Sequence, residues 1–151
     1  MDEDTFKFLK EREERLGAKI QYRTYALFYG ASNGEKREYG VFLYTDGDTF
    51  IFEDFDRPPR ILGIEIKSAK RPKYEKMEHS FKKNEVTGYQ IVTRKSAMAV
   101  IDMKAKHAKT ASAFAKAFQK VLVEISLGER KYYFEIMDEK NLRKIIFGGK
   151  I

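Results

Sequence analysis

The residues with the clearest chemical potential are Glu65 and Lys67, which stand one residue apart in the stretch GIEIKSA. Ile64 and Ile66 alternate with them, and this alternation predicts a strand over residues 61–69. In a strand, residues i and i+2 project to the same side. A carboxylate that binds a metal ion and a lysine that orients a water molecule could therefore share one site. On an exposed strand face the same two residues are simply a polar pair.

This pair is similar to half of the motif of the PD-(D/E)xK nucleases. The resemblance implies a first acid from the preceding strand, where Asp48 and Asp54 lie 17 and 11 residues before Glu65. A glutamate of an N-terminal helix, Glu11 or Glu14, could complete the site. A bound Mg²⁺ would then assist hydrolysis of a phosphodiester. The proline-aspartate half of the motif is missing at both aspartates.

The rest of the chain offers little catalytic chemistry. It contains no cysteine, which excludes disulfides, thiolate metal sites and cysteine nucleophiles. His79 and His107 lie 28 positions apart without metal-ligand spacing around them, so both are expected on the surface. Neither a glycine-rich phosphate loop nor a nucleophile elbow is present. We therefore expect no cofactor, and no metal outside the hypothetical site at Glu65.

The net charge of +7 is distributed unevenly along the chain. Residues 1–55 carry 8 Lys or Arg against 12 Asp or Glu. Residues 56–83 carry 9 against 4, and residues 93–120 carry 7 against 1. Concentrated positive charge attracts phosphates of lipid or nucleic acid. The alternative is a solvated surface that keeps a small domain soluble.

The first half of the chain predicts a helix followed by antiparallel strands. Apolar residues spaced along positions 1–17 indicate a short, partly exposed helix that ends at Gly17. Strands are predicted over residues 21–30, 37–45, 49–55 and 61–69. Asn33-Gly34 and Asp46-Gly47 are strong hairpin turns. Short turns between strands indicate an antiparallel meander and not a βαβ unit.

The second half predicts further strands, an inserted helix and a closing helix. Met77, His79 and Phe81 alternate weakly, as in an edge strand. Strands are predicted over Tyr89–Val92, Met98–Met103, Leu122–Leu127 and Lys131–Met137, with an alanine-rich helix near residues 105–120. Asp138 is expected to cap a C-terminal helix over residues 138–147, with Leu142, Ile145 and Ile146 as its buried face. No linker divides the chain, so residues 1–151 form one domain, with residues 20–137 mainly in antiparallel strands.

Residues 40–55 (GVFLYTDGDTFIFEDF) and 122–147 resemble the early hairpin and the final strand pair and helix of the pleckstrin-homology superfold, in its GRAM and bacterial versions. The resemblance implies an α+β fold. Its strongly bent antiparallel sheet, or partly open barrel, is closed by a C-terminal helix. Such domains commonly carry a tryptophan in that helix, and this chain has none. Leu142 or Ile145 would fill its place, and the helix near 105–120 would be an insertion.

The resemblance also implies a non-catalytic binding module. In lipid-binding members, basic residues around the first hairpin loop hold phosphoinositide headgroups. Here that loop offers Lys36 and Arg37, although the flanking Glu35 and Glu38 would weaken phosphate binding. A denser cluster follows the predicted strand at 61–69, and we hypothesise that it contacts an anionic partner. Its members are Lys67, Lys70, Arg71, Lys73 and Lys76.

Three functional hypotheses follow from the sequence. The first is a binding module for an anionic lipid headgroup or a protein partner, the second is the nuclease, and the third is a homo-oligomeric scaffold that pairs strand edges. Nucleic acid is a further partner for the basic middle of the chain. No apolar run approaches the roughly 20 residues that span a bilayer. The N-terminus also lacks the pattern of a secretion signal, so the expected location is the cytoplasm or the inner membrane face.

Overall fold

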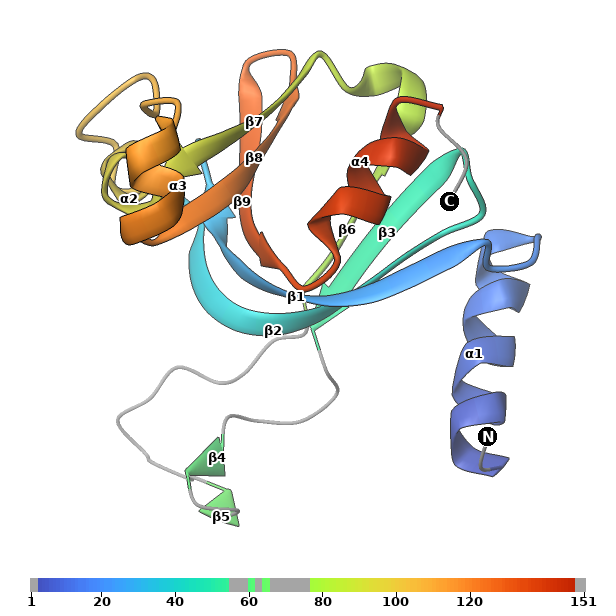
Figure 1. Cartoon of the computed structure of the whole chain (residues 1–151). Helices are drawn as coiled ribbons and strands as arrows, with labels where there is room; N and C mark the ends of the chain where they lie inside the picture. The colour runs from blue at the N-terminus through green and yellow to red at the C-terminus, as the bar shows by residue number, and fades with distance from the viewer. Residues whose placement is uncertain (1–2, 55–59, 62–63, 66–76, 149–151) are drawn as a thin grey trace.

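The computed structural model describes residues 3–54, 60–61, 64–65 and 77–148 (Figure 1). Its centre is a seven-stranded antiparallel sheet that curls into a half-barrel. Helix α1 (Glu3–Leu16) precedes the sheet, and helix α4 (Glu139–Ile146) follows it. The α+β fold class predicted from the sequence, with a bent sheet, a short N-terminal helix and a C-terminal helix, is confirmed.

The sheet is built from hairpins that meet at the first strand. Its spatial order is β6-β3-β2-β1-β9-β8-β7. The strands are β1 (Tyr22–Ala31), β2 (Lys36–Thr45), β3 (Thr49–Asp54), β6 (Glu78–Lys82), β7 (Gly88–Thr93), β8 (Val121–Leu127) and β9 (Arg130–Ile136). The one-turn helix η1 (Lys83–Glu85) leads from β6 to β7. Because β1 pairs with both β2 and β9, the two halves of the chain form one continuous sheet.

The prediction that residues 61–69 form one strand of this sheet is wrong for the residues of that range that are described; residues 62–63 and 66–69 lie outside the described part of the chain. The described residues of that stretch lie in β4 (Arg60–Ile61) and β5 (Ile64–Glu65), which pair with each other in a separate two-stranded sheet. The place beside β3 is taken by β6 instead. The weak alternation around His79 therefore predicted the edge strand correctly.

The prediction of a strand over Met98–Met103 is also wrong, because these residues lie in helix α2 (Arg94–Ile101) and the turn after it. The Thr93 hydroxyl caps α2 by accepting a hydrogen bond from the Ser96 N–H at 3.3 Å. Its buried residues are Ala97, Val100 and Ile101, which have the i, i+3, i+4 spacing of one helix face. The inserted helix near 105–120 is present as the shorter α3 (Ala113–Phe118).

The main core fills the concave side of the half-barrel. Aromatic side chains dominate it, among them Phe28, Phe52 and Phe134, whose rings pack edge-on or tilted with centroids about 5 Å apart. Helix α4 lies across the open side and buries Leu142 and Ile146 in this core (Figure 1). Of the two residues predicted to fill the place of the family's tryptophan, Leu142 is fully buried and Ile145 is partly buried against the same core.

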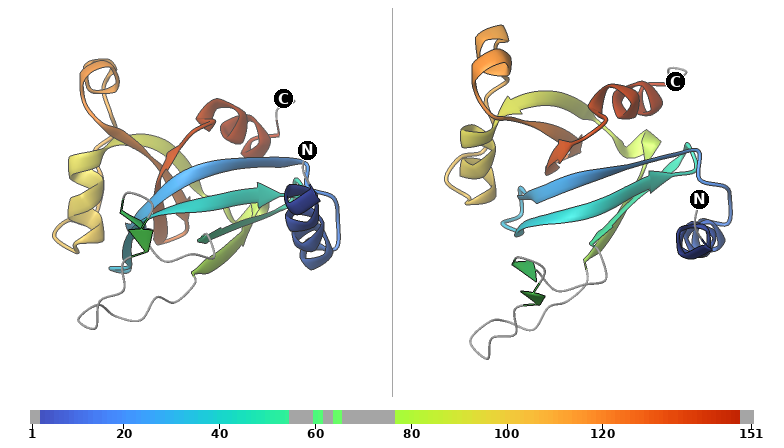
Figure 2. Two further views of the ribbon diagram at one scale, coloured as in Figure 1. Left: turned by 90° about the horizontal axis from the view of Figure 1, so that it is seen from below. Right: turned by 60° about the horizontal axis from the view of Figure 1, so that its bottom comes forward.

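Two helices cover separate parts of the convex side. Helix α1 packs on Phe42, Tyr44 and Ile51 of β2 and β3, and α2 packs on the strands around Tyr133. Figure 2 shows α1 and the α2–α3 region at opposite ends of the molecule. A different helix therefore covers the convex face of the sheet at each of its two ends.

Candidate functional site

The two aspartates that are alternatives for the first acid of the nuclease motif lie at opposite ends of β3. Asp48 is exposed in the turn before β3, whereas Asp54 is buried at the far end of the same strand. The Asp54 carboxylate accepts hydrogen bonds from the Arg37 guanidinium and from the Met77 N–H, the latter at 3.2 Å. Among the described residues there is no group of three His, Asp or Glu that could hold a metal ion. Asp54 therefore has a structural role.

The other residues of the nuclease hypothesis are not brought together in the described part of the chain. Glu11 and Glu14 are exposed on α1. Glu65 lies in β5, but its side chain and the whole of Lys67 lie outside the part of the chain that is described. The hypothesis therefore stays a prediction.

The predicted phosphate site at the first hairpin holds cations that already face carboxylates. The Lys36 Nζ lies 3.4 Å from an Asp102 carboxylate oxygen, and Arg37 pairs with Asp54. Glu35 contacts the His79 ring nitrogen at 3.0 Å. The hairpin therefore does not present two unengaged cations. The other five predicted residues, Lys67, Lys70, Arg71, Lys73 and Lys76, lie outside the described residues.

The two histidines differ in their surroundings. His107 is exposed, as expected from the sequence. His79 is half-buried, because its ring packs beside Phe52 and Tyr132 with centroids 5.3 and 5.6 Å away. His79 is therefore only partly exposed, whereas the sequence predicted a surface position.

The structure gathers the second basic stretch of the sequence into one part of the molecule. We call residues 94–120 the basic lobe; it comprises α2, α3 and the segment between them, and it lies at one flank of the half-barrel (Figures 1 and 2). Its cations are all exposed: Arg94, Lys95, Lys104, Lys106, Lys109, Lys116 and Lys120. Asp102 is its single acid, and it pairs with Lys36 of β2.

Most of these cations form no ion pair within the described part of the chain. Lys120 is an exception, because its Nζ lies 2.9 Å from Glu135, and this hydrogen bond raises the pKa of the ammonium. The Arg94 guanidinium lies 5.5 Å from the centroid of the Tyr29 ring. The remaining five form no ion pair with any other described residue: Lys95, Lys104, Lys106, Lys109 and Lys116. The lobe thus carries an uncompensated positive charge.

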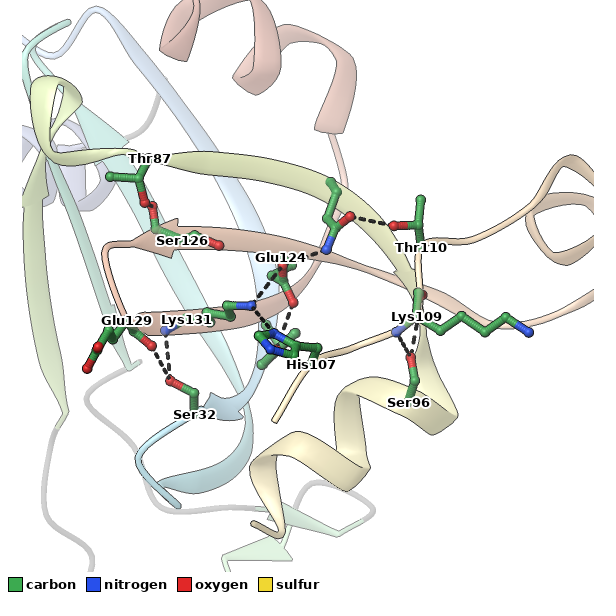
Figure 3. Close-up of polar contacts among 12 residues, drawn as sticks. Ser32, Thr87, Ser96, His107, Lys109, Thr110, Glu124, Ser126, Glu129 and Lys131 are labelled. Atoms are coloured by element: carbon green, nitrogen blue, oxygen red, sulfur yellow. Dashed lines mark hydrogen bonds and ion pairs between the residues drawn. The ribbon is translucent and has the colours of Figure 1, made fainter. Parts of the chain in front are cut away.

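Backbone hydrogen bonds fix the lobe to the edge strand β7. The N–H of Ala111 donates to the Ile91 carbonyl at 2.8 Å, and the N–H of Thr93 donates to the Lys109 carbonyl at 3.1 Å. The Lys109 N–H in turn donates to the Ser96 hydroxyl at 2.8 Å (Figure 3). Figure 3 also shows the Lys109 side chain extending away from the sheet. The cations are therefore presented from a fixed backbone.

A buried carboxylate of the sheet is connected to the lobe through hydrogen bonds. Glu124 of β8 is 2% exposed, and it accepts hydrogen bonds from Gln90 at 2.7 Å and from the Tyr133 hydroxyl at 2.8 Å. Lys131 lies 3.9 Å away from the same carboxylate, and Gln90 accepts a hydrogen bond from Thr110 of the lobe at 2.6 Å (Figure 3). Burial, followed by the hydrogen bond to Glu124, raises the pKa of Tyr133. These contacts join the lobe to the sheet. Because the Glu124 carboxylate is buried, it cannot serve as a binding site at the surface.

Helix α3 exposes two phenylalanines within the basic lobe. Phe114 is 65% exposed and Phe118 is 76% exposed, and their ring centroids lie 4.9 Å apart. Ala115 is the buried residue of this helix. Helical spacing in the sequence reveals that these residues share a face, but it does not reveal that this face points to solvent.

A groove of about 450 Å³ opens between α3 and the start of α4. Its walls are mainly apolar, and its charged residues balance: two lysines of the basic lobe stand against Glu135 and Glu139. The lining residues are Ile91, Lys116, Gln119, Lys120, Val121, Leu122, Val123, Phe134, Glu135, Ile136 and Glu139. Because the charges cancel, the groove favours neither an anion nor a cation.

Neither a protein-family model, nor a curated protein, nor a solved structure matches this chain. Within the described part of the chain, no helix combines the length and apolarity needed to cross a membrane. The function must therefore be argued from the surface that the fold creates.

Proposed function

We propose that the protein is a non-catalytic binding module that attaches to anionic lipid surfaces through the basic lobe. The observation that carries this proposal is the set of five exposed lysines without an ion pair to another described residue. A half-barrel closed by a C-terminal helix is also the arrangement implied by the resemblance to pleckstrin and GRAM domains. That resemblance supports a binding role over catalysis.

The expected strength of the electrostatic attraction is modest. A Lys or Arg near an anionic leaflet contributes about 1 kcal/mol. Five such lysines give about 5 kcal/mol, which corresponds to a dissociation constant of roughly 0.2 mM. Binding by charge alone would therefore be reversible and sensitive to salt, because the screening length falls from about 10 Å at 0.1 M salt to about 3 Å at 1 M.

Vesicle cosedimentation tests the proposal. We expect the protein to sediment with phosphatidylcholine vesicles that contain phosphatidylserine, and to remain in the supernatant with phosphatidylcholine alone or at high salt. The variant Lys104→Glu/Lys106→Glu/Lys109→Glu should abolish the sedimentation, since all three residues are exposed on the lobe. The matched control is Lys7→Glu/Lys10→Glu/Lys19→Glu, which makes the same change of charge at exposed positions on and just after α1.

Two outcomes would contradict the proposal in different ways. Equal loss of sedimentation in both triple variants would mean that net charge alone controls binding. A third variant, Lys70→Glu/Arg71→Glu/Lys73→Glu, tests the cluster favoured by the sequence. If only this variant fails to sediment, lipid binding stands but the basic lobe is not the site.

The test also separates the other hypotheses. Absence of sedimentation with every vesicle, combined with salt-sensitive binding to a polynucleotide, would replace the membrane with nucleic acid as the partner. The nuclease prediction is checked by incubating plasmid DNA with the protein and Mg²⁺ or Mn²⁺. A nick that disappears in Glu65→Gln would establish catalysis and refute a purely binding role.

A further inference from the structure

We propose that Phe114 and Phe118 insert into the lipid boundary of the membrane that the basic lobe binds. This inference rests on the proposed function, and it adds a second, apolar attachment to the electrostatic one. Single weak signals give marginal membrane binding, and stable attachment requires two. The geometry of α3 supplies the second signal within the charged surface itself.

The two rings form one exposed apolar surface. They lie four residues apart on α3, so they stand side by side along the helix. The small Ala115 occupies the buried side, and the Ser112 hydroxyl caps the helix by accepting the Ala115 N–H at 3.1 Å. If Phe114 and Phe118 served only to fill the core, they would be expected at the buried position of this helix, which Ala115 occupies. Two adjacent exposed rings form a contiguous apolar patch, the kind of surface through which proteins contact partners or membranes.

The apolar surface belongs to the same lobe as the unpaired lysines. Lys116 and Lys120 line the groove that also contains Glu135 and Glu139. Lys104, Lys106 and Lys109 are exposed and form no ion pair with another described residue. Met103, at the other end of the lobe's connecting segment, is a further exposed apolar residue at 70%. Aromatic residues beside lysines are typical of elements that lie in a membrane interface, because the rings enter the acyl boundary while the ammonium groups reach the phosphates. The charge of the lobe thus complements an anionic leaflet.

Two other occupants fit this surface less well. A base-stacking platform presents separate ring faces to successive bases, whereas Phe114 and Phe118 form one joint apolar surface at an interplanar angle of 40°. A two-fold interface with a second copy would bring the same lysines of both copies together, because such interfaces use the same patch on each subunit. Like charges facing each other oppose that association. An anionic lipid surface meets both the apolar and the cationic parts.

Tryptophan fluorescence tests the insertion directly. The chain contains no tryptophan, so Phe118→Trp creates a single reporter on α3. We expect its emission to shift to the blue when phosphatidylserine-containing vesicles are added, and to be quenched by lipids brominated in the acyl chain. The control is Phe6→Trp on α1, which is 60% exposed at the opposite end of the molecule and should show neither change (Figure 2).

A second variant measures the contribution to affinity. Phe114→Ala/Phe118→Ala removes two exposed rings, so it should fold normally while vesicle affinity falls on the order of tenfold, equivalent to about 1.4 kcal/mol. The binding that remains should depend more steeply on salt, since only the lysines would support it.

The outcomes distinguish the inference from the proposed function. If the protein sediments with vesicles but Phe118→Trp shows no shift, or if the double variant binds like the wild type, insertion is refuted and electrostatic binding stands. If no form of the protein sediments, both are refuted. A wild-type dimer that becomes monomeric in the double variant would also overturn the inference, because the rings would then form a subunit contact.

Discussion

The attachment of α1 to the sheet should depend on one buried ion pair. Arg12 is 5% exposed and Glu53 is 1% exposed, and the Arg12 Nε donates to a Glu53 carboxylate oxygen at 2.9 Å. Glu53 also contacts Arg15 at 3.3 Å and accepts a hydrogen bond from the Tyr44 hydroxyl at 3.3 Å. We predict that Arg12→Met lowers the free energy of unfolding by about 3 kcal/mol.

This magnitude follows from the surroundings of the carboxylate. Removing one partner of a buried ion pair typically costs about 3–5 kcal/mol, because the other charge stays buried without compensation. The lower end applies here, since Arg15 still reaches Glu53, although the Arg15 side chain is 44% exposed. Methionine suits this position because the Arg12 guanidinium lies only 3.7 Å from the centroid of the Phe8 ring, and an unbranched apolar side chain can preserve that packing.

Urea unfolding followed by circular dichroism measures the effect, and a thermal scan should show a midpoint lower by about 6–12 °C for a domain of 151 residues. Lys10→Met, at an exposed position of the same helix, should change stability by less than about 0.5 kcal/mol. The double variant Arg12→Met/Glu53→Gln should lose less than the sum of the two single variants. A value for Arg12→Met within 0.5 kcal/mol of wild type, or strict additivity in the cycle, would refute the claim that this pair holds α1.

Two further predictions concern the sheet. Gly30→Ala should lower the free energy of unfolding by about 2 kcal/mol or more, as measured by urea unfolding. Gly30 has a φ of +152°, and a Cβ there would lie 2.2 Å from the Glu35 carbonyl oxygen. Gly17→Ala is the control: Gly17 has a φ of +73° but a Cβ there would meet no atom within 4 Å, so this change should cost only about 1 kcal/mol. Burial raises the pKa of Tyr133, so the folded state keeps a proton that the unfolded chain loses above about pH 10, and stability should fall as the pH rises further. Tyr133→Phe should make this alkaline decline shallower by up to about 1.4 kcal/mol per pH unit, and an unchanged slope would contradict the assignment.

Local chemistry in the sequence was sufficient to predict the hairpins. The Asn-Gly and Asp-Gly pairs at the first two turns place glycine where φ is positive, at +94° for Gly34 and +103° for Gly47. The closing strand pair was predictable because apolar and polar residues alternate cleanly, so Phe134 faces the main core while Tyr133 faces α2. The conformation of these elements is determined by residues that lie close together in the sequence.

Other elements depended on signals that are weaker or more distant. The run AMAVI fits a strand and a helix equally well, and the capping interaction between Thr93 and Ser96 favours the helix. Asp138 stands at the start of α4 as predicted, but its side chain accepts hydrogen bonds from Tyr22 and Asn141 and not from the helix backbone. Tyr22 is 116 residues away, so no local pattern could have revealed this contact.

The candidate site was only partly visible in the sequence. The excess of positive charge in residues 93–120 could be counted directly. The pairing of Arg37 with Asp54 could not be foreseen, because it requires the register of β2 against β3, and it changes Arg37 from a ligand candidate into a structural residue. Likewise, only the packing of Ala115 decides that Phe114 and Phe118 face outward.

The positive charge of the basic lobe is not needed for the packing of the main core. The main core of the half-barrel contains no residue of the lobe, and α2 attaches through apolar side chains such as Val100 and Ile101. The side chains of Lys104, Lys106 and Lys109 are exposed and form no ion pair with another described residue, and the mutual repulsion of the lobe's cations opposes the compact state. The proposed anionic partner would account for this concentration of charge, which folding alone does not require. The consequence is that Lys104→Glu/Lys106→Glu/Lys109→Glu should abolish vesicle binding without lowering the free energy of unfolding. A variant that loses both together would show instead that these lysines serve the fold.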